Sequence, residues 1–188
     1  MNLELGVREA LDTVHFLGQD GKEHAIILRD GAVIFRADGT SKKVSLTDAH
    51  AQPGDILIHN HPNSLNSLSN VDIAQMFFAG YGAVYAISAD KSVYKASPAW
   101  SIKNPSEHAA RIFLEAWEGV WLETLPTLIY DVKPVVRNSK IQLEEAHWVN
   151  VELAEHGLIK YEFELGDATA LILSEIACHS TNNCKDKS

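Results

Sequence analysis

Residues 55–62 read Asp-Ile-Leu-Ile-His-Asn-His-Pro, and this stretch decides how the first half of the chain is organised. The apolar run Ile56–Ile58 follows a Pro-Gly pair and ends before a proline, which predicts a short buried strand. His59 and His61 are two apart at the end of that strand, so their side chains point to the same face of a sheet. Two imidazoles on one face can bind one metal ion.

The segments around this strand alternate between helical and strand patterns. Leu3 to Phe16 carries apolar residues at three- and four-residue steps, which is typical of one helical face. Two β-prone runs meet at Asp30-Gly31 and predict a hairpin. Together with a second strand pair further on, they predict an α/β fold with a mixed sheet flanked by helices. The predicted strand pairs are His24–Leu28 with Ala32–Phe35, and Ala83–Ile87 with Ser92–Lys95.

A third ligand follows the histidine pair after a polar loop. The chain is predicted to be helical from Ser69 through Phe78, and Gly80 ends the helix. Ser69 and Asp72 are three apart across the first turn and therefore face the same way. Three protein ligands with a fourth position left for water are typical of a catalytic zinc site, whereas a closed structural site uses four ligands, usually with cysteine.

The chemistry of such a site also requires a general base. Glu23 stands at the start of the first hairpin strand, which we expect to lie beside the Ile56–His59 strand, and we predict that Glu23 is this base. Asp20 and Asp30 are poorer candidates because both have the character of turn residues. His24 points to the opposite face from Glu23 in a regular strand.

Ser69 has two interpretations that are compatible with each other. Its hydroxyl can donate to the oxyanion of a tetrahedral intermediate. The pattern Ser-x-x-Asp is also close to a capping box, so Ser69 can cap the helix that it precedes.

The pattern His59-x-His61-x7-Ser69-x2-Asp72, with a glutamate upstream at a strand start, resembles the JAMM motif of MPN-domain (JAB-like) metalloproteases. The stretch Ile58 to Pro62 is similar to the RadC branch as well. The resemblance implies that His59, His61 and Asp72 bind Zn²⁺, that Glu23 is the acid/base, and that Ser69 stabilises the oxyanion. It covers roughly residues 1–97 and implies the JAB/MPN-like sheet with flanking helices.

The chain departs from RadC at Asn63-Ser64, where that branch usually carries Ser-Gly, and it has no helix-hairpin-helix segment in front. These departures weaken an interpretation based on nucleic acid and leave the zinc roles intact.

The second half of the chain has a different pattern, and we divide the sequence accordingly. Residues 1–97 form the predicted catalytic core, 98–179 a mainly helical extension packed on or beside it, and 180–188 a disordered tail. Within the extension we predict helices over Ser106–Glu123 and Ser139–His156, a separate short run bounded by Pro126 and Pro134, a strand over Leu158–Phe163 and a last helix over Ala168–Ala177. Trp117, Trp121 and Trp148 are predicted to be core or interface anchors.

Other groups of metal-binding residue types are weaker candidates. Cys178-His179 with Cys184 lies in the predicted tail and lacks a further ligand. Glu144, Glu145 and His147 resemble half of a carboxylate di-iron helix, but there is no second such helix, so we predict charges on a helix surface. The nucleases named for the letters His-Asn-His spread those residues over tens of positions. The (β/α)8 barrels that carry His-x-His need about 250 residues.

Composition limits the classes of partner. The chain of 188 residues is 46% hydrophobic and 22% charged, with a formal net charge of −9 and two cysteines near its end. No cluster of Lys and Arg stands out, which argues against a nucleic-acid backbone as the main partner. No apolar run is long enough to span a bilayer, and the N-terminus does not resemble a secretory signal. We predict a cytoplasmic location with a reduced cysteine pair, and the sequence gives no indication of the oligomeric state.

The sequence thus predicts a zinc-dependent metallopeptidase that hydrolyses a peptide or isopeptide bond. The resemblance implies a protein substrate, such as a ubiquitin-like protein or its conjugate. Two alternatives are a binding or scaffold module of the MPN class and a RadC-like protein associated with phage or mobile elements. The region 98–188 is a candidate for substrate recruitment, in which case the core would stay folded and zinc-loaded without it.

Overall fold

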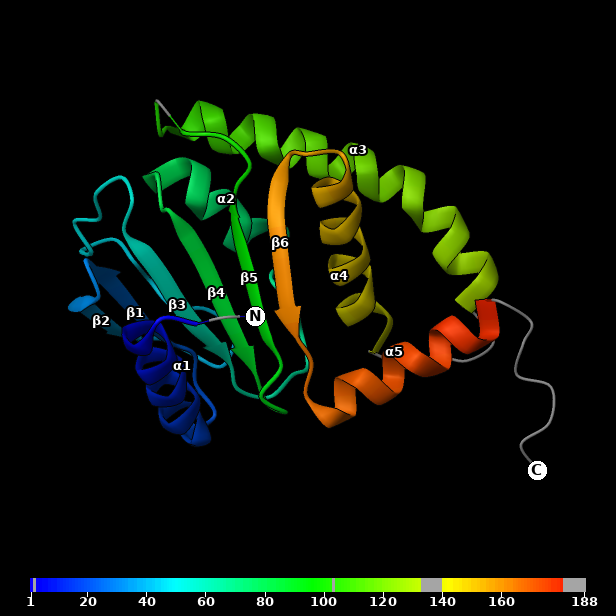
Figure 1. Cartoon of the computed structure of the whole chain (residues 1–188), viewed down its shortest axis with the longest axis horizontal. Coiled ribbons are helices and arrows are strands. Elements are labelled where there is room, and N and C mark those ends of the chain that lie inside the picture. Colours follow the sequence, from blue (N-terminus) through cyan, green and yellow to red (C-terminus); the bar gives the residue numbers. More distant parts are fainter. Residues whose placement is uncertain (2, 103, 133–139, 181–188) are drawn as a thin grey trace.

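A mixed sheet forms the centre of the computed structural model, which describes residues 1, 3–102, 104–132 and 140–180. Within these ranges the sheet has six strands in the order β2-β1-β3-β4-β5-β6 (Figure 1). All neighbouring strands are antiparallel except β3 and β4, which are parallel. The strands are β1 (His24–Arg29), β2 (Ala32–Asp38), β3 (Ile56–His61), β4 (Ala83–Ser88), β5 (Val93–Pro98) and β6 (Ile159–Glu164).

Helices cover both faces of this sheet, as the α/β prediction requires. One helix, α1, packs on β1, β3 and β4, while α2 contacts β4 and β5 and also packs against α3. The helices are α1 (Leu5–Leu17), the short 3-10 helix η1 (Gly18–Asp20), α2 (Asn70–Ala79), α3 (Glu107–Val132), α4 (Lys140–Glu155) and α5 (Asp167–Ser180). No helix in the described ranges is long and apolar enough to cross a membrane.

The predicted hairpin is present and fixes the first edge of the sheet. β1 and β2 are joined by Asp30 and Gly31, whose φ values are 51° and 77°. Two consecutive positive φ angles are those of a type I′ turn, which matches the twist of the flanking strands. β1 also pairs with β3, with Ala25 opposite His59, so the predicted neighbourhood of these two strands is confirmed.

The crossover from β3 through α2 to β4 places the start of α2 near the end of β3. A tight turn can join only antiparallel strands. Two parallel strands therefore need a longer crossover connection, here through α2. Gly80 ends α2 with a φ of 77°, a left-handed conformation that glycine adopts without strain. The predicted helix after Ser69 and its stop at Gly80 are therefore confirmed.

Strand alternation separates the interior into two apolar clusters. Ile26 and Ile58 point toward α1 and pack with its buried face, whereas Ile27 and Leu57 point to the opposite side, where α2 lies. His59 and His61 have the same parity as Leu57 and therefore face the α2 side. Asn60 has the parity of Ile58 and faces the α1 side.

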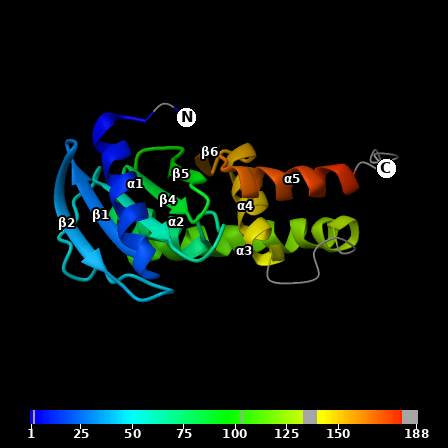
Figure 2. The same ribbon diagram turned by 90° about the horizontal axis from the view of Figure 1, so that it is seen from below.

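The C-terminal part of the chain belongs to the same sheet and to the same core. β6 pairs with β5 along its whole length, from Val93 opposite Glu164 to Pro98 opposite Ile159. Val149 and Leu153 of α4 are fully buried in the cluster that contains Leu57. Figures 1 and 2 show α3 and α5 reaching past the β6 edge of the sheet.

The helix boundary predicted at Pro126 is wrong. Pro126 does not bound a separate run, because α3 continues through it to Val132, and its ribbon bends along its length (Figure 1). An interior proline removes one backbone hydrogen bond and kinks a helix, but it does not have to end one. Trp117 and Trp121 pack against the core earlier in α3, which holds the helix in place before the proline. Pro134 and residues 181–188 lie outside the described residues.

Candidate metal centre

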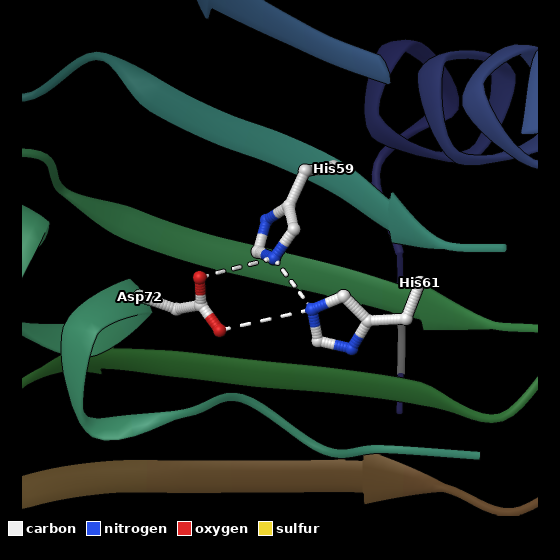
Figure 3. A group of neighbouring side chains, drawn as sticks. All are labelled: His59, His61 and Asp72. Carbon is white, nitrogen blue, oxygen red and sulfur yellow. Dashed lines mark hydrogen bonds and ion pairs between the residues drawn. The ribbon is translucent and has the colours of Figure 1, made fainter. Parts of the chain in front are cut away.

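The strand β3 and the first turn of α2 bring three metal-binding side chains together. His59 and His61 extend from the same face of β3, and Asp72 reaches toward them from α2 (Figure 3). One ligand atom from each residue lies within 4.8 Å of the other two. His59 is almost completely buried, whereas His61 and Asp72 keep some exposure to solvent.

Local sequence explains how Asp72 is held. Ser69 is the N-cap of α2, and its Oγ accepts a hydrogen bond from the Asp72 backbone at 3.2 Å. Asp72 Oδ2 in turn accepts from the Ser69 backbone N–H at 2.8 Å and from the Ser69 hydroxyl at 2.7 Å. This reciprocal capping box fixes the carboxylate at the helix start, so the predicted capping role of Ser69 is confirmed.

The distances between the ligand atoms fit a tetrahedral ion. His59 Nε2 is 3.0 Å from His61 Nε2 and 3.4 Å from Asp72 Oδ1, and His61 Nε2 is 3.7 Å from Asp72 Oδ2. Ligand atoms about 2.0–2.1 Å from one tetrahedral zinc ion lie roughly 3.3 Å apart. A zinc-sized ion therefore fits between the three side chains with small adjustments.

The hydrogen bond of the His61 imidazole favours the tautomer that a metal needs. His61 Nδ1 lies 2.9 Å from the carbonyl oxygen of Asn66, which can only accept a hydrogen bond. The neutral ring therefore carries its proton on Nδ1 and leaves the Nε2 lone pair facing the cluster. Within the described ranges, Nδ1 of His59 is buried without a hydrogen-bond partner.

Electrostatics favour an ionised Asp72. Burial acts to raise the pKa of the Asp72 carboxyl, but His59 and His61, with the hydroxyl of Ser69, hold this pKa well below its usual range. Burial also opposes the charged form of His59, yet the neighbouring carboxylate raises the pKa of His59 overall. Burial and His59 together lower the pKa of His61. The ionised Asp72 and the neutral His61 are in the protonation states that ligate a metal, whereas a metal ion would displace the proton that Asp72 favours on His59.

Glu23 lies in the cleft that contains the three ligands. It is half-buried and immediately precedes β1, and it has the parity of Ala25, which faces the α2 side. Burial raises the pKa of the Glu23 carboxyl, with His59 acting to lower it and Asp72 to raise it. A carboxyl with a raised pKa beside a metal cluster has the properties of a general base that works near neutral pH.

The alternative carboxylates lie elsewhere. Asp20 Oδ1 is 3.1 Å from Nε2 of His24, whose Nδ1 is 2.8 Å from Asp38 Oδ1. His24 has the parity of Ile26 and thus points away from Glu23, as predicted. Asp30 occupies the hairpin turn.

The cleft over the cluster has a volume of about 1140 Å³ and is open to solvent along the surface. One wall comes from the segment between β2 and β3, including Lys42 and Lys43, and the other from α2, including the exposed side chains of Val71 and Phe78. Such a cleft has room for an extended chain segment rather than for a small molecule alone. The wall between β2 and β3 could not be predicted, because that segment has neither helical nor strand periodicity in its sequence.

Among the weaker metal candidates, the side chains that the structure describes, His147 and Glu145, belong to no second group of metal-binding residues. His147 is buried among aromatic rings, so its prediction as a surface residue is wrong; its Nδ1 contacts Tyr161 Oη at 3.1 Å. Glu145 lies near the indole N–H of Trp121, at 3.5 Å. The group formed by Cys178, His179 and Cys184 falls on residues whose side chains are not described.

The fold and the cluster together define an α/β protein with a candidate metal site of two histidines and one aspartate. Comparisons with protein-family models, with curated proteins and with solved structures find no match to this chain. The function is therefore inferred from the site and from the motif that the sequence carries.

Proposed function

We propose that this protein is a zinc-dependent peptidase that hydrolyses a peptide or isopeptide bond. The observation that carries the proposal is the joint presence, in one cleft, of an open three-ligand cluster and a half-buried glutamate. Three ligands leave a coordination position for substrate or water, which a structural zinc site does not. The resemblance of the motif to the JAMM pattern supports the same assignment.

Each residue has a defined role in this proposal. His59, His61 and Asp72 hold the ion, which would lower the pKa of a water molecule and polarise the substrate carbonyl. Glu23 accepts a proton from the attacking water and returns it to the leaving amine as the C–N bond breaks. The new C–O bond comes from that water, so the products are a carboxylic acid and an amine.

Ser69 requires one rearrangement to take part. Its hydroxyl donates to Asp72 Oδ2 in the structure, and it must turn toward the cleft to donate to an oxyanion. The backbone N–H of Ser69 also donates to the same carboxylate oxygen, so Asp72 keeps a hydrogen bond when the hydroxyl turns away. Capping the helix and stabilising the oxyanion are therefore successive uses of one side chain.

The shape of the cleft supports a polypeptide substrate. Its walls run from the β2–β3 segment to α2, and the metal ligands lie between them. We propose that an extended chain, such as the C-terminal tail of a ubiquitin-like protein or its conjugate, lies in this cleft with the scissile carbonyl at the cluster. A scaffold module would need neither a complete ligand set nor Glu23.

The test combines metal content with an unbiased cleavage assay. Protein purified without chelator or affinity tag is analysed for zinc and then incubated with a proteome-derived peptide library supplemented with isopeptide-linked lysine peptides. We expect about one zinc ion per chain and defined new peptide ends, and a Glu23→Gln variant that keeps zinc and cleaves about a hundredfold slower or worse. The control is Glu9→Gln, because Glu9 is exposed on α1.

Two outcomes contradict the proposal. A wild-type protein without zinc, or a zinc-loaded one that cleaves nothing in the library, leaves the binding-module alternative. Equal cleavage by wild type and Glu23→Gln removes Glu23 from the role of base.

A further inference from the structure

Asn60 lies between the two histidine ligands in sequence but on the other face of the sheet. Its side chain is buried, with 1% of its surface exposed, and it packs against the end of α1. A Cβ atom added at Gly18 would lie 2.1 Å from Asn60 Nδ2, so the absence of a side chain at Gly18 makes room for the amide. A buried amide at this position must be hydrogen-bonded, because an unpaired one is costly.

The amide of Asn60 holds the backbone on both sides of Glu23. Asn60 Nδ2 donates to the carbonyl oxygen of Lys22 at 3.0 Å, and Asn60 Oδ1 accepts from the backbone N–H of His24 at 2.6 Å. Lys22 and His24 are the two neighbours of Glu23 in the chain. One side chain thus fixes the two peptide groups that flank the proposed base.

These two side-chain hydrogen bonds take the place of backbone pairing between β1 and β3 where that pairing ends. The β1–β3 register ends at Ala25 opposite His59, and the next pair along the ladder would be His24 opposite Asn60. On its other side, Glu23 is held by the segment after β2, since its N–H donates to Thr40 at 2.8 Å and its carbonyl accepts from Gly39 at 2.7 Å. Without Asn60, the segment before β1 would be attached to the hairpin side and, on the β3 side, only through Asn63 Nδ2, which donates to the carbonyl oxygen of Gly21 at 3.3 Å among the described contacts.

We propose that Asn60 is a positioning residue that keeps the Glu23 carboxylate on the metal face of the sheet. This inference rests on the proposed function, since it assigns Asn60 to the base of that same site. The three residues His59, Asn60 and His61 then act as one unit. The outer two supply ligands on one face, and the middle one fixes the base from the other face, because alternate strand residues point to opposite sides.

Amide hydrogen exchange measured by NMR on the zinc-loaded full chain tests the placement directly. In Asn60→Ala, the amide of His24 loses its acceptor and should exchange roughly tenfold faster or more, while the amides of Ile26 and Ile27 in the middle of β1 keep their rates. The matched control is Asn150→Ala, which removes another fully buried asparagine whose Nδ2 donates to Leu68 and not to this segment. Asn60→Asp is the second variant, because it keeps the volume and the acceptor for His24 but loses the donor to Lys22.

A kinetic cycle separates positioning from a general loss of structure. With the library peptide that the wild type cleaves fastest, Asn60→Ala should lower kcat by about tenfold or more, and it should cause no further loss in the Glu23→Gln background. A structural defect alone would slow both backgrounds by the same factor. Zinc content should stay near that of the wild type in Asn60→Ala, in Glu23→Gln and in the double variant.

The outcomes distinguish this inference from the proposed function. Unchanged His24 exchange in Asn60→Ala, equal acceleration in Asn150→Ala, or equal slowing in both kinetic backgrounds would each overturn the role of Asn60. For Asn60→Asp, retained His24 protection with a lowered kcat supports the inference, and a wild-type kcat overturns it. Absence of zinc or of cleavage in the wild type contradicts the proposed function instead.

Discussion

The candidate metal centre and the surroundings of His147 on α4 both hold a buried histidine, but they differ in charge and in access to the open cleft. His59 and His61 face a carboxylate and an open cleft; the carboxylate raises the pKa of His59, whereas burial and His59 lower the pKa of His61. His147 on α4 is enclosed by aromatic rings, with the ring of Phe163 4.7 Å and that of Tyr161 5.7 Å away, and burial lowers its pKa to about 4. The comparison shows that an imidazole becomes a candidate ligand through its neighbours and not through burial alone.

The two regions also differ in how they are attached to the fold. The metal centre is built from a strand end and a helix start that lie close together in sequence. The aromatic region joins α4 to β6 and belongs to the core that contains Val149, Leu153 and Ile159.

Removing the C-terminal part of the chain, which contains the aromatic region, should have the largest effect on stability. Deletion of residues 98–188 takes away the β6 edge strand together with the buried side chains of Phe113, Val149 and Leu153. We expect the remaining fragment to lose cooperative thermal unfolding, as measured by circular dichroism, because the α2 face of the sheet becomes exposed to water. A folded, zinc-loaded fragment of residues 1–97 would instead mean that the extension is a separable module that recruits substrate.

Removing one ligand should affect metal binding rather than folding. His61→Ala is expected to weaken zinc binding on the order of a thousandfold, since structural zinc sites with four ligands bind with roughly 10–16 kcal/mol in total. Competition with a chromogenic chelator measures the affinity, and chemical denaturation of the metal-free protein measures the stability. The control His108→Ala changes an exposed histidine on α3 and should leave both unchanged. Unaltered zinc affinity in His61→Ala would remove this residue from the site.

The sequence predicted the metal centre better than the aromatic region, for a physical reason. Ligands two apart in a strand and a Ser-x-x-Asp pair three apart in a helix have directions that local geometry sets. The placement of Glu23 in the same cleft followed from the predicted pairing of two neighbouring strands, which is a short-range inference as well. The fold class followed from the same alternation of strand and helix patterns.

The missed features depend on contacts that are remote in sequence. The pattern around His147 resembles a charged helix surface, and its burial follows from the pairing of β6 with β5, which brings Tyr94 and Phe163 opposite each other. The passage of α3 through Pro126 depends on tertiary packing that overrides a local signal. Strand parity alone places the amide of Asn60 on the α1 face. Its hydrogen-bond partners, the N–H of His24 and the carbonyl oxygen of Lys22, could be identified only from the structure.

The pH dependence of stability should report on His147. In the folded protein its pKa is lowered to about 4, whereas an ordinary histidine titrates near 6.5. Both states are neutral above pH 6.5, so stability there is unaffected. As the pH falls from 6.5 to 4, the unfolded chain binds a proton that the folded chain does not, and stability is lost by about 3 kcal/mol in total.

The measurement compares wild type with His147→Phe by urea unfolding at pH 7 and at pH 4.5. The phenylalanine fits the aromatic surroundings and cannot be protonated, so the difference in unfolding free energy between the two pH values should be smaller in the variant. Equal pH dependence in both proteins would show that His147 is already protonated, or solvated, in the folded state.

The smallest predicted effect lies where the two regions meet. Asn150 on α4 is fully buried, its Nδ2 donates to the carbonyl oxygen of Leu68 at 2.8 Å, and its Oδ1 accepts from Trp117 at 3.4 Å. Leu68 precedes the helix cap at Ser69, so this bond anchors the loop between His61 and Asp72 to the C-terminal helices. Asn150→Ala should cost about 2 kcal/mol of unfolding free energy, because it leaves a buried carbonyl unpaired.

The same variant should also weaken zinc binding by roughly tenfold, in the range typical of groups that orient metal ligands. Leu153→Ala provides the control, since it opens a cavity in the same helix and core without removing a hydrogen bond to the loop, and it should lower stability by about 2–5 kcal/mol while zinc affinity stays the same. Equal losses of zinc affinity in the two variants would mean that the metal centre senses overall stability. A loss confined to Asn150→Ala would mean that the C-terminal region sets the position of Asp72.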